Sequence, residues 1–126
     1  MQREIKFRVW SIKDKKMFSF DEASMTGVNM QSYQIPLLSA AFADKTSNYF
    51  IPLQFTGLKD KNGKEIYEGD VIKGLFDYGP AGFLKNKYPV TWDNKLGYQW
   101  EYWDLTSVEV IGNIFENPEL INEKLQ

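Results

Sequence analysis

The chain has 126 residues, of which 43% are hydrophobic and 25% charged, and its formal net charge is −2. These values are typical of one globular domain that is large enough to bury a core of its own. The sequence contains neither Cys nor His, which excludes disulfides, thiolate nucleophiles, Ser-His-Asp triads and imidazole metal ligands. Most familiar catalytic constellations are therefore excluded from the start.

No apolar run approaches the roughly 20 residues that a membrane-spanning helix needs. Charged residues also stand near the N-terminus, at Arg3, Glu4 and Lys6, where a signal peptide would be apolar. We therefore expect a cytoplasmic protein with no membrane partner.

Residues 4–10 alternate between two faces, which predicts a half-buried strand. One face carries Ile5, Phe7 and Val9, and the other carries Lys6, Arg8 and Trp10. After a polar turn at 13–16 the extended pattern resumes, so we expect an N-terminal β-hairpin over residues 3–20. Residues 21–47 have no sustained period and are expected to be irregular, either a long ordered loop or a subunit contact. Within them, the apolar run 37–42 fits a helical turn or a strand.

Residues 49–116 consist of short strand-like segments separated by glycine-containing turns. Asn62-Gly63 is a strong hairpin signal, and Gly69-Asp70 predicts a second tight bend. Asn117 can cap a helix and Pro118 suits its first position. The sequence therefore predicts a mainly β fold. We expect a small SH3-like β-barrel over residues 49–116, joined by the N-terminal hairpin and followed by a short C-terminal helix over 117–125.

Three blocks of sequence resemble one known family. They are Met1–Trp10 followed by Lys15–Met17, then Gln54–Ile72 (QFTGLKDKNGKEIYEGDVI), then Val110–Leu120 (VIGNIFENPEL). In this order they are similar to the YopX family of phage and prophage proteins. The resemblance implies a single YopX-like domain over residues 1–126, a phage or prophage origin in a bacterial host cell, a β-rich fold and self-association. It implies no activity, cofactor or catalytic residue.

Acidic residues near the central turns are candidates for an active or metal site. Asp60 could begin a calcium loop, but the fifth position is Lys64 and the twelfth is Val71, where a bidentate Glu belongs. The carboxyl groups of Glu65, Glu68 and Asp70 could act as acid and base. Such groups beside a hairpin are more often solvated or bonded to a backbone N–H. We therefore predict no catalytic residue, no cofactor and no metal.

Two groups of residues are candidates for a binding surface. The first combines cationic and aromatic side chains, Lys6, Arg8 and Trp10, although charge on a strand is also an ordinary way to keep it soluble. The second is Tyr98, Trp100 and Tyr102, which alternation places on one face of a strand. Such a face could be barrel core, a protein interface, or a platform for unpaired bases with Lys85, Lys87 and Lys95 on the phosphates.

We expect a non-enzymatic accessory protein that binds an unidentified protein and self-associates as a homo-oligomer. The alternative is a nucleic-acid-binding barrel that uses the basic and aromatic residues. A carboxylate-based hydrolase ranks third.

Overall fold

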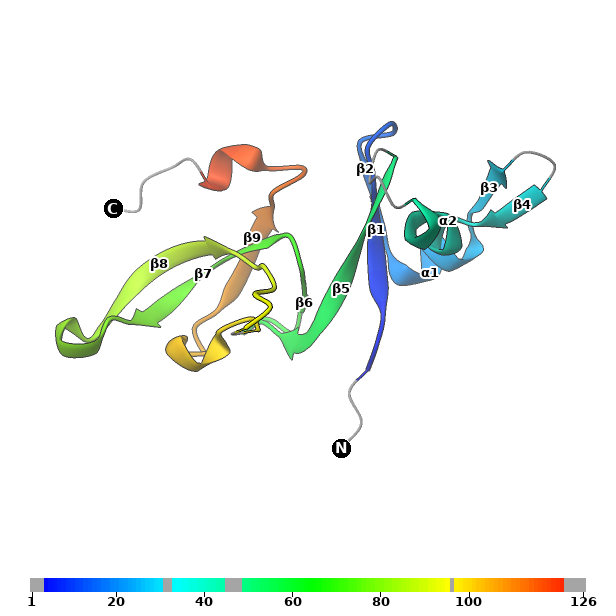
Figure 1. The fold of residues 1–126 in the computed structure, drawn as a ribbon. Helices are drawn as coiled ribbons and strands as arrows, with labels where there is room; N and C mark the ends of the chain where they lie inside the picture. The colour runs from blue at the N-terminus through cyan, green and yellow to red at the C-terminus, as the bar shows by residue number, and fades with distance from the viewer. Residues whose placement is uncertain (1–3, 31–32, 45–48, 96, 122–126) are drawn as a thin grey trace. The chain divides into compact units, whose positions relative to one another are not determined.

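A computed structural model describes residues 4–30, 33–44, 49–95 and 97–121. These residues form a mainly β fold with nine strands, two α-helices and three short 3-10 helices (Figure 1). The chain divides into two compact units, Met1–Phe55 (unit 1) and Thr56–Gln126 (unit 2). The division falls within strand β5 (Phe50–Lys59). None of the described helices is both long and apolar enough to cross a membrane.

The predicted N-terminal hairpin is present in unit 1. Strand β1 (Phe7–Ser11) pairs antiparallel with β2 (Lys16–Phe18) on one side and with β5 on the other. Val9, for example, stands opposite Phe18 in β2 and Pro52 in β5. The alternation in residues 4–10 therefore did identify a strand, and its pairing on both sides makes it the middle strand of unit 1.

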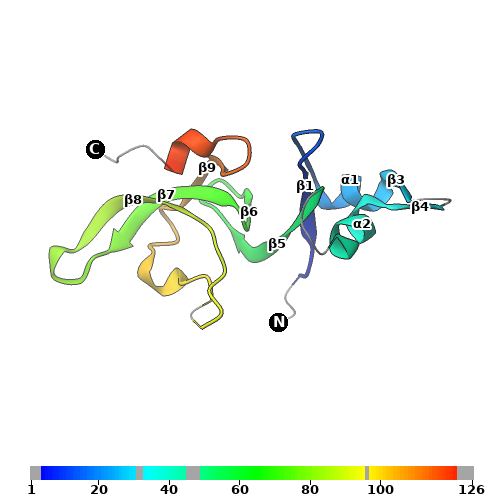
Figure 2. The same ribbon diagram turned by 45° about the horizontal axis from the view of Figure 1, so that its top comes forward.

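The segment expected to be irregular contains regular elements. It holds α1 (Phe20–Met25), β3 (Gly27–Met30), β4 (Tyr33–Pro36) and α2 (Leu37–Ala43), and the two helices lie side by side (Figures 1 and 2). The run 37–42 is thus helical rather than extended. Residues 31, 32 and 45–47 of this segment lie outside the described residues.

A capping box starts α1. Ser19 Oγ accepts a hydrogen bond from the Glu22 N–H (3.2 Å), and Glu22 Oε1 accepts one from the Ser19 N–H (3.0 Å). Two of the orphan donors at the helix start are thereby satisfied. The hydrogen bond from the Ser19 N–H favours the ionised carboxylate and lowers the pKa of Glu22.

The core of unit 1 is aliphatic and small. Val9 and Ala23 have no exposed surface, and Leu37 and Ala41 are nearly as buried. Alanines on α1 and α2 let the helices approach β1 closely, and Val28 and Phe50 close the cluster at its edges. This burial gives α1, which is only six residues long, the tertiary support that an isolated short helix lacks.

Unit 2 is built around strand β7 (Asp70–Asp77). It pairs antiparallel with β8 (Phe83–Pro89) and with β9 (Glu109–Asn113), in the order β8-β7-β9. Strand β6 (Glu65–Tyr67) neighbours β5 in a different sheet. The mainly β fold contains a sheet that curls into a half-barrel. The core contains Ile66, Ile72, Val90 and Val108.

Strand β8 ends the strand order of this sheet, and one of its backbone donors is satisfied locally. The Lys87 N–H donates to Asn86 Oδ1 at 2.8 Å. That amide group is therefore bonded to the side chain of its own neighbour.

Three central glycines have a left-handed backbone, two of them in turns and Gly57 within β5. Gly57, Gly63 and Gly69 have φ angles of 91°, 83° and 88°, a region that is costly for residues with a Cβ. The turn assignment made from Asn62-Gly63 and Gly69-Asp70 is confirmed. It leads β5 into β6, and then β6 into β7.

The C-terminal prediction is tested only at its start. Pro118–Ile121 form a 3-10 helix, and residues 122–125 of the expected helix lie outside the described residues. Asn117, expected as a helix cap, uses its Oδ1 to accept a hydrogen bond from the Asn113 N–H at 3.2 Å. A Cβ on Gly112 would lie 2.6 Å from that same Oδ1, so a glycine is needed for the segment to return against β9.

Candidate binding site

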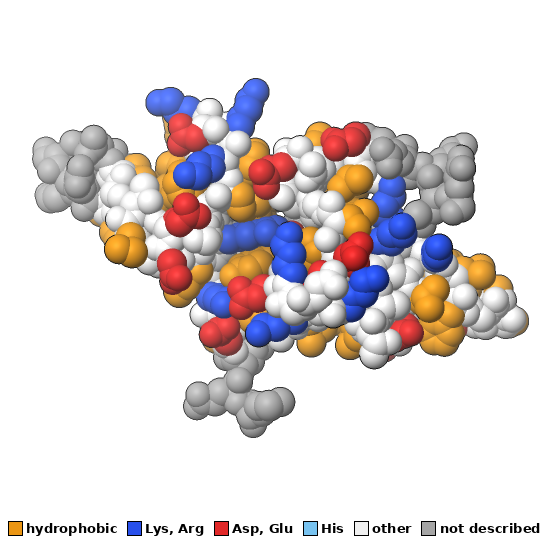
Figure 3. All heavy atoms as spheres, turned by 180° about the vertical axis from the view of Figure 1, so that it is seen from behind, with side chains coloured by type: hydrophobic (Ala, Val, Ile, Leu, Met, Phe, Trp, Pro, Cys, Tyr) orange, Lys and Arg blue, Asp and Glu red, His pale blue; other side chains and the backbone are white. Residues whose placement is uncertain are grey.

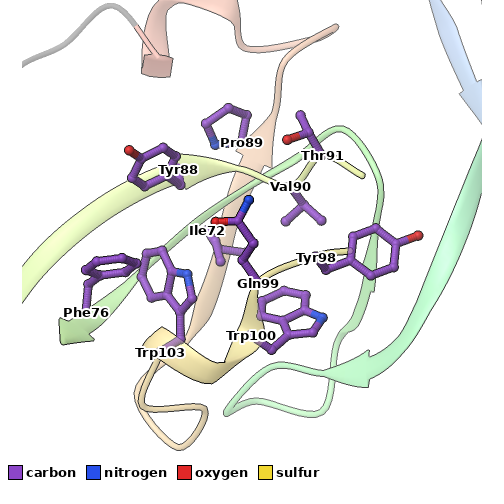
Figure 4. A pocket seen from close by; sticks show the side chains of 10 residues that line it. All are labelled: Ile72, Phe76, Tyr88, Pro89, Val90, Thr91, Tyr98, Gln99, Trp100 and Trp103. Atoms are coloured by element: carbon purple, nitrogen blue, oxygen red, sulfur yellow. The ribbon is translucent and has the colours of Figure 1, made fainter. Parts of the chain in front are cut away.

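Unit 2 contains a hollow of about 250 Å³, which we call the aromatic hollow. Its walls come from β7, from β8 and the residues just after it, and from segment 98–103 (Figure 4). The side chains that characterise it are Phe76, Tyr88, Tyr98, Gln99, Trp100 and Trp103. None of the ten described residues in its lining carries a charge.

Strand register explains one wall of the aromatic hollow. Ile72 pairs with Tyr88, and Phe76 pairs with Leu84 four residues further along the two strands. Because side chains alternate along a strand, Ile72, Phe76 and Tyr88 share one face of the sheet. Gly74 lies between Ile72 and Phe76 on that face, and a Cβ there would lie 3.0 Å from Ser107 Oγ. The absence of a side chain at Gly74 lets the segment before β9 pack closely on β7.

The rings of the hollow contact one another. Phe76 packs edge-on against Trp103 with centroids 5.1 Å apart, and Trp103 packs at a right angle to Tyr88 at 6.3 Å. Tyr98 contacts Trp100 at 6.2 Å and Trp92 at 4.9 Å. Tyr88 remains 52% exposed. The packing holds the rings in place while part of their surface stays open to solvent.

Gln99 is the polar feature of the hollow. Its side-chain amide lies in the middle of the surrounding side chains (Figure 4), and no described residue forms a hydrogen bond with it. Its backbone is left-handed, with φ 60° and ψ 38°, which costs a residue with a Cβ about 1–2 kcal/mol. Residues held in this region are enriched at functional sites, and Gln99 is among the residues that line the hollow.

The strand prediction for residues 98–102 is wrong. Tyr98 lies in a turn, and Trp100–Tyr102 form a 3-10 helix. The left-handed backbones of Gly97 and Gln99 interrupt any extended run. Tyr98 and Trp100 line the hollow, whereas Tyr102 lies outside its lining and contacts Phe76 at 5.9 Å. The Trp100 Nε1–H is buried, and no described residue accepts its hydrogen.

The exposed basic face predicted for Lys6, Arg8 and Trp10 is also wrong. Trp10 is only 8% exposed, and the Lys6 side chain is 18% exposed, with Nζ 3.1 Å from Glu4 and 5.0 Å from the centre of the Phe55 ring. Alternation tells which residues share a face, but it does not tell whether that face is covered. These residues belong to unit 1, so they are not part of the aromatic hollow.

The lysines proposed for phosphate contacts do not share the face of the aromatic hollow. Lys73 pairs with Lys87, and Leu75 pairs with Lys85. Alternation turns these residues to the side of the sheet opposite Tyr88. Lys95 is exposed in the turn after Trp92 and does not line the hollow. Figure 3 shows hydrophobic side chains gathered at the end of the molecule where the β7–β8 hairpin turns.

Asp60 is held by backbone amides rather than poised for chemistry. Its Oδ1 accepts from the N–H groups of Asn62 (2.8 Å) and Lys64 (2.9 Å), and its Oδ2 accepts from the Val110 N–H (2.9 Å). Burial by itself would raise the pKa of Asp60, but these three donors outweigh it and hold the pKa below its ordinary value. The carboxylate thus fastens the 60–64 turn to β9.

Asp70 and Glu68 also accept hydrogen bonds, one from a backbone amide and one from a side chain. Asp70 is buried, and its Oδ2 accepts from the Tyr67 N–H at 2.8 Å across the Gly69 bend. Glu68 Oε2 accepts from the Tyr98 hydroxyl at 3.2 Å. Within the described ranges, no three or more acidic side chains gather in a way that could hold a metal ion. The carboxylates of Asp70 and Glu68 therefore bond a backbone bend and a tyrosine hydroxyl.

Comparison with known proteins agrees with this β-rich architecture. The model of the YopX protein family matches residues 6–122, so the chain belongs to the YopX family, and the match extends over both units. A similar solved structure is the crystal structure of protein EF1440 from Enterococcus faecalis. It is 26% identical, and the alignment covers 95% of this chain and 99% of that one, with a TM-score of 0.58. A search of curated proteins found no match.

Proposed function

We propose that this YopX-family chain is a non-enzymatic accessory protein of a phage or prophage that acts in the bacterial cytoplasm by binding another protein. The observation that carries the proposal is the aromatic hollow, with packed rings, a half-exposed Tyr88 and a strained Gln99 whose amide bonds no described residue. Tyrosine and tryptophan are enriched at protein interfaces because they offer large, rigid contact areas. We also propose that residues 49–116 form an SH3-like barrel around this site.

A protein ligand is favoured over a nucleic acid by the distribution of charge in unit 2. A strand of nucleic acid needs stacking rings and phosphate-binding cations along one path. Here Lys73, Lys85 and Lys87 lie on the side of the sheet opposite Tyr88. Nucleic-acid binding therefore remains the second candidate, supported by the rings alone.

A hydrolase ranks third. Asp60 and Asp70 already accept backbone hydrogen bonds, so the lone pairs that would take a proton from substrate are largely occupied. Self-association stays part of the proposal, because an exposed ring such as Trp92 (54%) could also meet a second copy. Gel filtration with light scattering tests it, and a monomer at every concentration removes that part.

The main experiment is capture from the infected or lysogenic host with tagged protein, with and without nuclease, followed by mass spectrometry. We compare the wild type with Tyr88→Ala, which removes a ring from the aromatic hollow. The matched control is Phe83→Ala, because both rings lie on β8, both are about half exposed, and register turns Phe83 to the opposite face. We expect a partner protein that survives nuclease and is lost only with Tyr88→Ala. Capture that depends on nucleic acid, or that is equal for both variants, contradicts the proposal.

A further inference from the structure

We infer that the aromatic hollow binds a cationic side chain, arginine in the first place, presented by the partner protein. This inference rests on the proposed function and specifies the chemistry of the same site. Three features of unit 2 carry it: the rings, the surrounding charge and the Gln99 amide.

The rings supply the first argument. A cation is attracted to the face of an aromatic ring, most strongly to Trp and next to Tyr. Two Trp, two Tyr and one Phe line the hollow. A volume of about 250 Å³ is large enough for one long side chain, and no charged residue of the lining competes for it.

The surrounding charge supplies the second argument. Glu68 accepts a hydrogen bond from the Tyr98 hydroxyl, and a phenol that donates to a carboxylate holds a more electron-rich ring. Glu101 is exposed between Trp100 and Tyr102. The hairpin lysines lie on the other face of the sheet. The side of unit 2 that holds the hollow therefore complements a positive charge.

Gln99 supplies the third argument. Its amide lies among the rings (Figure 4) without a hydrogen-bond partner among the described residues. The amide oxygen can accept from the N–H groups of a guanidinium, whose flat shape also suits stacking on Trp. A lysine ammonium would find the same rings, but it lacks the planar surface. This is why we place arginine first.

The test follows the four tryptophan indole N–H signals by NMR while N-acetyl-arginine-methylamide is added. The matched probe is N-acetyl-citrulline-methylamide, which has nearly the same shape without the charge. We expect saturable shifts of Trp100 and Trp103, with a response to the arginine probe about three- to fivefold stronger than to the citrulline probe. Trp10, which is buried in unit 1, serves as the internal reference.

Two variants sharpen the test. Glu68→Gln keeps a hydrogen-bond acceptor for Tyr98 but removes the charge, so it should weaken the response to arginine and leave that to citrulline unchanged. Phe83→Ala should change neither response. Both variants must keep the wild-type signal dispersion, which shows that unit 2 is folded.

The inference is overturned by equal responses to the two probes, by no response, or by a stronger response to a single-stranded oligonucleotide than to arginine. Its failure is distinguishable from failure of the proposed function. If the host partner still depends on Tyr88 while arginine has no effect, the hollow binds protein through other chemistry. If arginine binds but no partner depends on Tyr88, the charge preference stands and the proposed function does not.

Discussion

Unit 1 and unit 2 differ in what fills their cores and in what fastens their turns. In unit 1, Val9, Ala23, Leu37 and Ala41 pack two short helices on a strand, and a capping box starts the first helix. In unit 2, buried Asp60 and Asp70 fasten turns through backbone N–H groups, and aromatic rings surround a hollow. Unit 1 is therefore held together by close packing of apolar side chains. In unit 2, buried carboxylates bond the turns, and the aromatic rings leave an open site.

The largest expected effect is on the core of unit 1. Leu37→Ala should lower the free energy of unfolding by about 3 kcal/mol, because it removes a side chain that is only 2% exposed and leaves a cavity. Urea unfolding measures the change, and hydrogen exchange should quicken first in residues 7–43. Leu84→Ala, at a position that is 51% exposed, should cost less than about 0.5 kcal/mol. If hydrogen exchange became faster by the same amount in both units, the proposed difference between their cores would be contradicted.

The corresponding change in unit 2 is Asp60→Asn. It should cost about 2 kcal/mol, since an amide replaces a charged acceptor of three partly buried backbone hydrogen bonds. Hydrogen exchange should quicken at Asn62, Lys64 and Val110. Asp77→Asn is the control, because among the described residues that exposed carboxylate accepts only from the Gly79 N–H. If the two substitutions cost the same, Asp60 is not the fastener described.

Acidification should remove the stabilisation that the Asp60 carboxylate provides. The folded pKa of Asp60 lies below its ordinary value of 3.8, so the stabilisation is complete above that value and is lost as the pH falls through the folded pKa. The cost of Asp60→Asn, measured by urea unfolding, should therefore shrink between neutral pH and a pH of about 3. A cost that stays constant over this range would mean that the charge contributes nothing.

A smaller loss is expected from the capping box of unit 1. Ser19→Ala removes the acceptor for the Glu22 N–H and should cost about 1 kcal/mol, measured by thermal or urea unfolding. Ser24→Ala is the control within the same helix, because Ser24 Oγ donates to the Phe20 carbonyl and such a bond adds little. A larger cost at Ser24 than at Ser19 would contradict the capping role.

The smallest expected change in stability has the opposite sign. Gln99→Gly relieves the left-handed strain but gives the unfolded chain more freedom, so the variant should be between neutral and about 1 kcal/mol more stable. It should also weaken the arginine response, because the amide is gone. A loss of more than about 2 kcal/mol would show that Gln99 serves the fold rather than the site.

The parts of the structure that local chemistry determines could be predicted from the sequence. Asn62-Gly63 and Gly69 marked their turns because few residues other than glycine adopt positive φ. Helix α1 also had a signal in the sequence, since Ser19 and Glu22 have the spacing of a capping box, but the prediction overlooked it. The apolar residues Ile66, Val71 and Ile72, which flank the Gly69 bend, are buried.

The parts that depend on tertiary context could not be predicted. Nothing local indicates that the Trp10 face is covered, because the neighbours of Trp10 in the sheet, Met17 and Ile51, come from two other strands. A glutamine in the sequence also does not indicate a left-handed backbone. The alternating aromatic residues around Gln99 therefore suggested a strand. The aromatic residues of the site were foreseen in part, but their gathering around Gln99 needed Phe76 and Tyr88 from a different hairpin.

The hydrogen bond between the Lys87 N–H and Asn86 bears on how a partner can dock. Strands at a sheet border often recruit a foreign strand through unpaired backbone groups, which leads either to β-augmentation or to aggregation. On β8 that route is hindered, because one amide is already occupied and Lys85 and Lys87 add repulsive charge. A ligand of unit 2 is therefore expected to contact side chains and not the backbone of β8. The same features of β8 hinder aggregation through its edge.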